Sequence, residues 1–137
     1  MKVKLDKNAY TPIRAHKTDA GLDIKAKDGQ LVPAHGNAVF FTGVHVELPK
    51  NTCGILVSKS GLNTKFDITS TGLIDEGYTG EIAIKLYNHG DHDYYVEKGD
   101  KISQLIIVPV LYESIELVDD LEISSERGLD GFGSTGR

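Results

Sequence analysis

Cysteine, methionine and tryptophan are scarce in this sequence: 137 residues include one cysteine, one methionine and no tryptophan. The single cysteine, Cys53, excludes a disulfide framework within the chain and a cysteine cage for zinc, and it favours a reducing compartment. No apolar run approaches the length of a transmembrane helix, and the first residues lack the apolar region of a signal peptide. We therefore expect a cytoplasmic protein that makes no use of a membrane.

A surplus of positive charge is also missing. Fifteen Lys and Arg residues stand against twenty Asp and Glu residues, so the net charge is −5. This argues against general binding to nucleic acid or to anionic membrane, which depends on a surplus of Lys and Arg. Glycine, in contrast, is abundant, with 15 residues, and it points to many turns. The length suits one domain with a single core.

Short apolar segments with strand character recur along the chain. Residues 44–48 and 81–86 alternate apolar and polar side chains, as half-buried strands do. Residues 102–111 are almost wholly apolar and predict a strand that is buried on both faces. A further strand is expected over residues 54–57 and one short helix over residues 60–65. Short strands separated by turn signals indicate an all-β sandwich or barrel.

The corner between that strand and that helix is a candidate phosphate site. Strand-to-helix corners present free amide groups to anions, so Lys59, Ser60 and the amide of Gly61 could hold phosphate oxygens. The alternative is an ordinary N-capping serine, either Ser58 or Ser60.

Two further segments carry candidate carboxylates. Asp75 ends an apolar run within residues 72–80, where it could be a general base or a metal-binding carboxylate. The alternative for Asp75 is a residue that merely forms the turn. Residues 89–93 combine two histidines and two aspartates, but they lack the spacing and the distant ligand that define a zinc site.

Glycine dominates residues 127–137. Residues 131–136 match G-x-G-x-x-G, yet the dinucleotide fingerprint needs a strand before it and a helix after it; only Arg137 follows, so we expect no dinucleotide-binding fold. Small residues with free amides, two hydroxyls and the flanking Arg127 and Arg137 suit a polyphosphate. The alternative is a mobile tail without a ligand.

Taken in order, these segments resemble the five motifs of the trimeric dUTP diphosphatase (dUTPase) family. The resemblance implies a distorted jelly-roll β-barrel over residues 1–126, and a homotrimer whose swapped glycine-rich arm, residues 127–137, closes over the active site. It also implies Mg²⁺-dependent hydrolysis of dUTP to dUMP and diphosphate, which limits uracil in DNA and supplies dUMP for thymidylate synthesis. The five motifs lie at Ala20–Ala26, Ser58–Leu62, Gly72–Ile82, Gly99–Ile106 and Arg127–Gly136.

The resemblance also implies roles for single residues. Asp75 matches the carboxylate that activates the attacking water, and Tyr78 matches the ring that stacks under the deoxyribose. Backbone groups around Gly72 and Ala83 would read the uracil edge, and Asp23 would hold Mg²⁺ through water. The remaining matches contact phosphates (Lys59, Ser60, Gly61, Gln104, Arg127, Ser134 and Thr135), cover the uracil (Phe132) or let the backbone approach (Gly133).

The sequence departs from the family motifs at three positions. Lys59 and Lys101 stand where arginine is common, and Asp130 occupies a usual glycine position; these changes bear on affinity for dUTP. Two alternative functions stay open, a dCTP deaminase-type enzyme of the same superfamily and a regulatory binding protein that keeps the fold. A regulatory protein partner in addition to catalysis is also compatible with the sequence.

Overall fold

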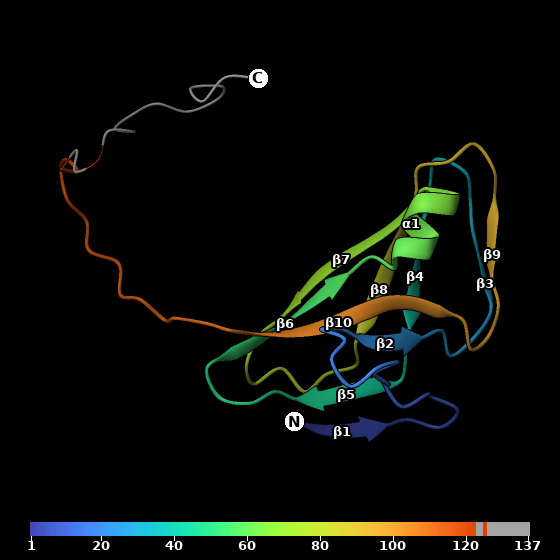
Figure 1. Ribbon diagram of the computed structural model, residues 1–137, viewed down its shortest axis with the longest axis horizontal. Helices are drawn as coiled ribbons and strands as arrows, with labels where there is room; N and C mark the ends of the chain where they lie inside the picture. Colours follow the sequence, from blue (N-terminus) through green and yellow to red (C-terminus); the bar gives the residue numbers. More distant parts are fainter. Residues whose placement is uncertain (123–124, 126–137) are drawn as a thin grey trace.

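The computed structural model describes residues 1–122 and residue 125, and all of its regular elements but one are strands (Figure 1). Within these residues, no helix has the length and apolar character needed to cross a membrane. The elements in chain order are β1 (Lys2–Leu5), β2 (Leu22–Lys25), β3 (Gln30–Val32), β4 (Asn37–Phe41), β5 (Val44–Glu47), β6 (Thr52–Val57), α1 (Ser60–Phe66), β7 (Ile68–Ile74), β8 (Ala83–Asn88), β9 (Tyr94–Val96) and β10 (Lys101–Pro109).

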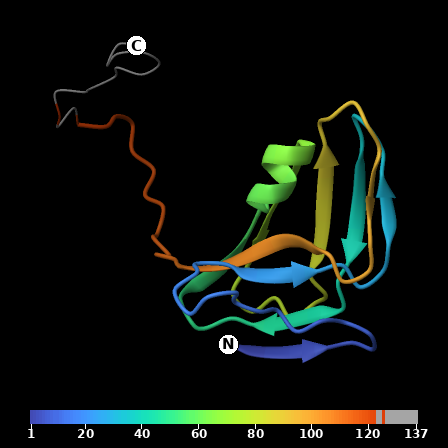
Figure 2. The same cartoon turned by 45° about the vertical axis from the view of Figure 1, so that its right-hand side comes forward.

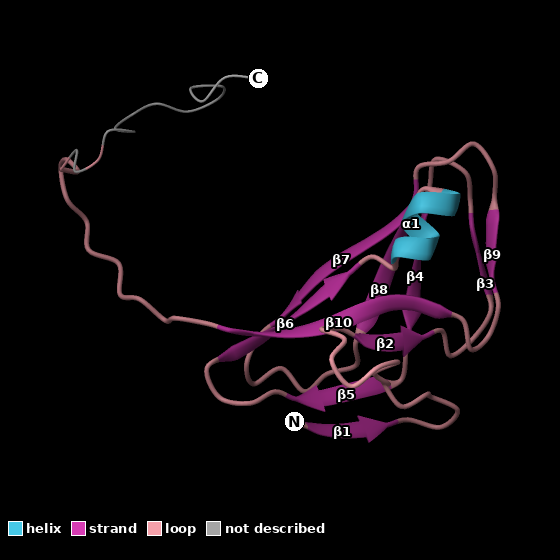
Figure 3. Cartoon of the chain, viewed as in Figure 1, coloured by secondary structure: helices cyan, strands magenta, loops and turns pink. Residues whose placement is uncertain are grey.

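One large antiparallel sheet organises the body. Its six strands follow the order β2-β10-β6-β7-β8-β4, and two smaller sheets pair β1 with β5 and β3 with β9. Figure 3 shows α1 as the one helical element among the drawn strands, and it packs beside β7. Turning the molecule shows that the sheet curls, with β2 and β10 crossing near the lower ends of β4 and β8 (Figure 2). The predicted all-β class is therefore confirmed.

The core lies inside this curled sheet and follows the predicted alternation. Val44, Val46 and Leu48 are buried, whereas Glu47 between the last two is exposed. The same holds for β8, where Ile84 and Leu86 have no exposed surface. Burial of one apolar face on each strand provides most of the driving force for this fold.

Two predicted strands have different bounds in the structure. The strand expected over residues 81–86 covers Ala83–Asn88, because the amide of Ile82 donates to the carbonyl of Val44 instead of to a ladder partner in β4. The strand expected over residues 102–111 ends at Pro109, and its second half is only partly buried. Proline has no N–H with which to continue the ladder, and Leu111 beyond it is 84% exposed.

After β10 the chain leaves the body as an extended segment (Figure 1). Its start is fixed by two hydrogen bonds, from the amide of Val110 to the carbonyl of Asn51 and from the hydroxyl of Tyr112 to Oε2 of Glu76 at 2.7 Å. Large apolar side chains along this segment have little to pack against within one chain. They are Leu111, Tyr112, Ile115, Leu117, Val118 and Leu121.

Candidate functional site

A buried carboxylate is surrounded by cations at the edge of the large sheet. Asp23 on β2 pairs with Gln104 on β10, and its side chain is 3% exposed. The ammonium nitrogen of Lys59 lies 2.6 Å from Oδ1 of Asp23, and that of Lys101 lies 2.7 Å from Oδ2. Nε2 of Gln104 donates to Oδ1 at 3.3 Å. Three predicted site residues thus meet here, and Lys101 joins them; we call these four residues the Asp23 cluster.

The charges of the Asp23 cluster favour a bound anion. Burial alone would raise the pKa of the Asp23 carboxyl, but the hydrogen bonds from Lys101 and Lys59 outweigh it and hold that pKa below its ordinary value. The carboxylate is therefore ionised at neutral pH. Two ammonium groups against one carboxylate leave one positive charge in surplus, and phosphate oxygens are suited to neutralise it.

The corner that leads into α1 lies directly beside this cluster in the chain. Lys59 is the N-cap residue, with extended backbone angles (φ −73°, ψ 126°), and no side chain caps the helix. The N-capping alternative is therefore wrong for both serines: Ser58 instead accepts from the amide of Ser70 and donates to its carbonyl. Ser60 is exposed, and a side-chain carbon added at Gly61 would meet nothing within 4 Å. The start of the helix is thus exposed to solvent at both residues.

The other predicted site residues lie on the turn between β7 and β8. The amide of Tyr78 donates to the carbonyl of Asp75 at 3.1 Å, and the hydroxyl of Tyr78 donates to the carbonyl of Glu81 at 3.0 Å. The Asp75 carboxylate is exposed and takes no part in this turn bond, so the turn does not depend on its side chain. Gly72 lies within β7, and Ala83 begins β8.

The Asp75 turn and the Asp23 cluster stand at opposite ends of the central strands. Ile74, just before Asp75, pairs with Gly54 of β6, and Gly54 pairs with Ile107 of β10. Gln104 lies three residues before Ile107, so Asp75 and Gln104 are about 13 Å apart along the strand direction at ~3.3 Å per residue. A general base must come within hydrogen-bond distance of its water. Within one chain, the Asp75 carboxylate and the Asp23 cluster therefore lie too far apart to contact the same atom.

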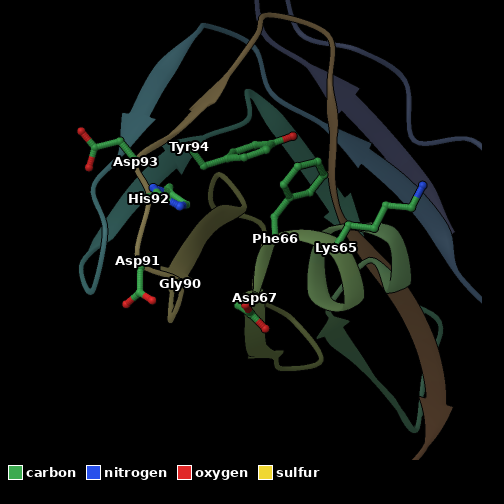
Figure 4. A pocket seen from close by; sticks show the side chains of 8 residues that line it. All are labelled: Lys65, Phe66, Asp67, Gly90, Asp91, His92, Asp93 and Tyr94. Atoms are coloured by element: carbon green, nitrogen blue, oxygen red, sulfur yellow. The ribbon is translucent and has the colours of Figure 1, made fainter.

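A separate cavity of about 230 Å³ lies between the end of α1 and the turn that joins β8 to β9 (Figure 4). The rings of Phe66 and Tyr94 lie 4.8 Å apart in its wall, and the carboxylates of Asp91 and Asp93 point away from these rings. Asp91 contacts His35, and Asp93 accepts from the amide of Ala34. The cavity contains none of the predicted site residues. Across the described ranges, no three His, Cys, Asp or Glu residues are grouped as a metal site.

Some predicted site residues lie outside the described residues. They are Arg127, Phe132, Gly133, Ser134 and Thr135, together with the departing position Asp130.

Two residues contribute to these groups beyond the predicted site residues. Lys101 departs from its motif, and an irregularity of register between Lys101 and Ser103 accompanies its contact with Asp23. Glu81 lies in a predicted strand, but its carboxylate accepts from the amide of Gly43 at 2.6 Å and so anchors the end of the Asp75 turn. Lys101 could have been found from its place in the fourth motif, whereas Glu81 carries no signal in the sequence.

Proteins of known family resemble this chain over nearly its whole length. The family model described as dUTPase matches residues 7–136. The chain is 46% identical over 136 residues to the deoxyuridine 5'-triphosphate nucleotidohydrolase of Clostridium acetobutylicum, a match that covers 97% of this chain and 93% of the relative.

Solved structures give the same result. The Staphylococcus bacteriophage 80alpha dUTPase with dUpNHpp is 35% identical, with a TM-score of 0.92 over 99% of this chain and 98% of that chain. A mutant dUTPase of S. aureus phage phi11, described with a structural Mg(II) ion, is 31% identical, with a TM-score of 0.81 over 88% of this chain and 97% of that one. The curled sheet is thus the jelly-roll fold of these enzymes, and the chain belongs to the dUTPase family.

Proposed function

We propose that this protein hydrolyses dUTP to dUMP and diphosphate, breaking the bond between the α-phosphorus and the oxygen that bridges it to the β-phosphorus. The observation that carries the proposal is the Asp23 cluster, a cationic corner beside the exposed start of α1, in a chain of the dUTPase family. Phosphoryl transfer depends on neutralising and positioning the phosphates more than on covalent chemistry.

The phosphate-binding residues come from the Asp23 cluster and the helix start. We assign phosphate contacts to Lys59, Ser60, the amide of Gly61 and Gln104. Lys59 and Gln104 both donate to Oδ1 of Asp23. Their donor groups therefore converge on one place, where a phosphate oxygen can replace the carboxylate oxygen. When a triphosphate binds, its oxygens compete with Asp23 for the lysines and release part of that carboxylate.

Asp75 is proposed as the general base. Its exposed carboxylate is free to accept a proton from water, a role that general bases fill with rate gains of ~10²- to 10⁴-fold. We assign the neighbouring Tyr78 to the deoxyribose, because it matches the stacking ring of the family's third motif. Its 3.0 Å bond to the Glu81 carbonyl holds the ring in place. Backbone groups at Gly72 and Ala83, on the two strands that frame the turn, would read the uracil.

We propose that the enzyme is a homotrimer with each active site formed between chains. Asp75 and the Asp23 cluster lie at opposite ends of β6, which suits a site whose base and phosphate-binding residues come from different copies. The exposed apolar side chains of residues 111–121 give such copies a surface to cover. Cyclic assembly is the usual form for homo-oligomers.

A magnesium ion fits the residues present. Asp23 supplies hard carboxylate oxygens, and the described residues form no larger cluster of acids and histidines, so they suit an ion that is bound mainly by substrate oxygens and water. We propose that Asp23 holds the water shell of Mg²⁺ once dUTP has drawn the lysines away. The ion would neutralise charge on the phosphates.

Residues 127–137 are proposed to complete the site as an arm beyond the domain of residues 1–126. Arg127, Ser134 and Thr135 would contact phosphates, Phe132 would cover the uracil, and Gly133 would let the backbone approach. We place the enzyme in the cytoplasm, the reducing compartment that its single cysteine favours. The deaminase alternative is not favoured, because the family model and the curated relative are both dUTP hydrolases by name.

A substrate panel tests the proposal. Diphosphate release is measured with dUTP, dTTP, dCTP and UTP, each with Mg²⁺ and with a chelator. We expect release from dUTP alone, and its loss in chelator. Ammonia release from dCTP, or equal rates with dUTP and UTP, would contradict the assignment.

A further inference from the structure

A histidine outside the dUTPase motifs ties the Asp75 turn to the rest of the fold. His45 lies on β5, and its side chain is 17% exposed. Its Nδ1 lies 3.0 Å from the carbonyl oxygen of Thr79, which is next to Tyr78. Its Nε2 lies 3.1 Å from Oδ2 of Asp6 in the loop after β1. One ring therefore links the N-terminal loop to the middle of the turn.

Both partners of the ring can only accept hydrogen bonds. A carbonyl oxygen has no proton to donate, and the hydrogen bond from His45 keeps the pKa of Asp6 below its ordinary value, so that carboxylate is ionised. A neutral imidazole carries one N–H and can satisfy only one of the two acceptors. The observed geometry thus favours the imidazolium form, in which both ring nitrogens donate.

The surrounding charges agree with this protonation state. The hydrogen bond to the Thr79 carbonyl and then the one to Asp6 raise the pKa of His45, whereas Lys4, its cross-strand neighbour, opposes the rise. A cavity of about 340 Å³ adjoins the ring. The charged groups around the ring are Lys2 and Lys4 on β1, Asp6 after β1, Glu47 on β5 and Glu81 on the turn.

The link matters because it holds the part of the turn that carries the nucleotide-binding residues. Beyond Thr79 the turn is anchored by Glu81, which accepts from the amide of Gly43, and by the amide of Ile82, which donates to Val44. Before Thr79, Glu76 accepts from the amide of Asn51 and from the hydroxyl of Tyr112, and the amide of Tyr78 donates to the carbonyl of Asp75 within the turn. Between these two anchored ends, His45 connects β5 to Thr79, the residue that follows Tyr78.

We propose that His45 is a positioning residue whose imidazolium form holds the Asp75 turn in its nucleotide-binding shape, so that nucleotide binding weakens as the ring loses its proton. The choice of nucleotide as the ligand rests on the proposed function. The protonation state of the His45 ring does not. On deprotonation, one of the two hydrogen bonds is lost, and either Thr79 or Asp6 faces an unprotonated nitrogen.

The test combines a ring titration with a binding titration. Ring signals of the five histidines are followed by NMR from about pH 5.5 to pH 9, around the ordinary histidine pKa of ~6.5, and His45 is assigned from the signal that His45→Gln lacks. The dissociation constant of dUpNHpp is measured by calorimetry over the same range. His35→Gln is the matched control. It removes an exposed histidine that contacts Asp91 and precedes the end of β4 that lies away from the Asp75 turn.

The ratio of dissociation constants, His45→Gln over wild type, cancels the titration of the nucleotide itself. We expect a ratio of about 2- to 10-fold at the acid end, the usual range for one lost hydrogen bond, falling towards one as the His45 ring signal titrates. His35→Gln should give a ratio near one throughout. Asp6→Asn, which removes the negative partner, should move the midpoint of the His45 signal to lower pH.

The failures are distinguishable. A ratio that does not change with pH, or an Asp6→Asn midpoint equal to that of wild type, would overturn the inference. If His45→Gln does not fold, wild type and Asp6→Asn are compared instead. The pH midpoint of dUpNHpp binding must then shift between these two proteins by as much as the pH midpoint of the His45 ring signal. Wild-type protein that fails to bind dUpNHpp at any pH would instead contradict the proposed function, while the NMR titration still reports the state of the ring.

Discussion

The ammonium group of Lys101 lies 2.7 Å from Oδ2 of Asp23, on the opposite side of the carboxylate from Lys59. Both partners sit on neighbouring antiparallel strands, β10 and β2. This arrangement keeps the buried carboxylate of Asp23 ionised in the free protein. The contribution of that carboxylate to stability should therefore depend on pH.

Asp23→Asn should change how stability responds to acid. The pKa of Asp23 is lowered by folding, so its ionised form stabilises the protein above the ordinary carboxyl value near 3.8 and loses that contribution as pH falls through the folded-state pKa. The free energy of unfolding of wild type minus that of Asp23→Asn should therefore be positive at neutral pH and shrink in acid. Urea titrations at fixed protein concentration measure it.

Asp28→Asn is the matched control, since it removes one negative charge from an exposed position on the following turn. A wild-type minus Asp23→Asn difference that stays constant from neutral to acid pH would show that the lysine contacts do not hold the carboxylate as described.

Gly80→Ala should displace the ring of Tyr78. A side-chain carbon at residue 80 would lie 2.8 Å from Cε2 of that ring and closer still to its hydroxyl end. Because the turn is exposed, we expect little change in melting temperature but a rise in KM for dUTP of about tenfold, within the range of ~1–3 kcal/mol for a stacking contact. Steady-state kinetics measure it.

A double-mutant cycle supplies the control. In a Tyr78→Ala background, Gly80→Ala has no ring to displace and should add almost nothing, since contacting residues couple in such cycles. An equal effect of Gly80→Ala in both backgrounds would mean that it acts through the backbone and not through Tyr78.

The positions of the strands could be only partly predicted from the sequence, and their order in the sheet could not. Alternation located Val44–Leu48 well, because a buried face and an exposed face leave opposite residue types. The start of β8 lies two residues later than predicted, since Ile82 is buried by a loop contact that has the same apolar signature as a ladder contact. The motifs placed Asp23, Lys59 and Gln104 in one site, but not the contact of Lys101 or the anchoring role of Glu81, which depend on register and loop geometry.

Two inactive variants should complement each other. Asp75→Asn removes the proposed base and Lys59→Met removes a proposed phosphate contact, and the two residues lie at opposite ends of β6. If each site joins different copies, mixed trimers formed by co-refolding contain sites with both residues intact, in about a quarter of cases for random mixing in a closed ring. Light scattering should give about three chain masses for each variant.

Activity of the mixture that equals the sum of the separate variants would place base and phosphate contacts in the same chain. A monodisperse monomer at micromolar concentration would contradict the proposal that chains share a site.

Deletion of residues 127–137 should reduce turnover sharply while leaving the melting temperature and the trimer mass nearly intact. The deleted part contains Arg127 and Phe132, which we assign to phosphate and uracil, but none of the core residues of the body. Phe132→Ala should cause part of the loss, through a stacking contact of about 1–3 kcal/mol. Full activity of the shortened protein would show that these residues take no part in the reaction.

The most direct test of the account is the release of dUMP from dUTP by wild type and by Asp75→Asn. Asparagine keeps the shape of the side chain but cannot accept the proton of water, so turnover should fall by at least ~10²-fold, the lower bound of a general-base contribution. Binding of dUpNHpp should persist or tighten, because a carboxylate near the phosphates is removed. Turnover of Asp75→Asn above about a tenth of the wild-type rate, well short of that expected fall, would contradict the account.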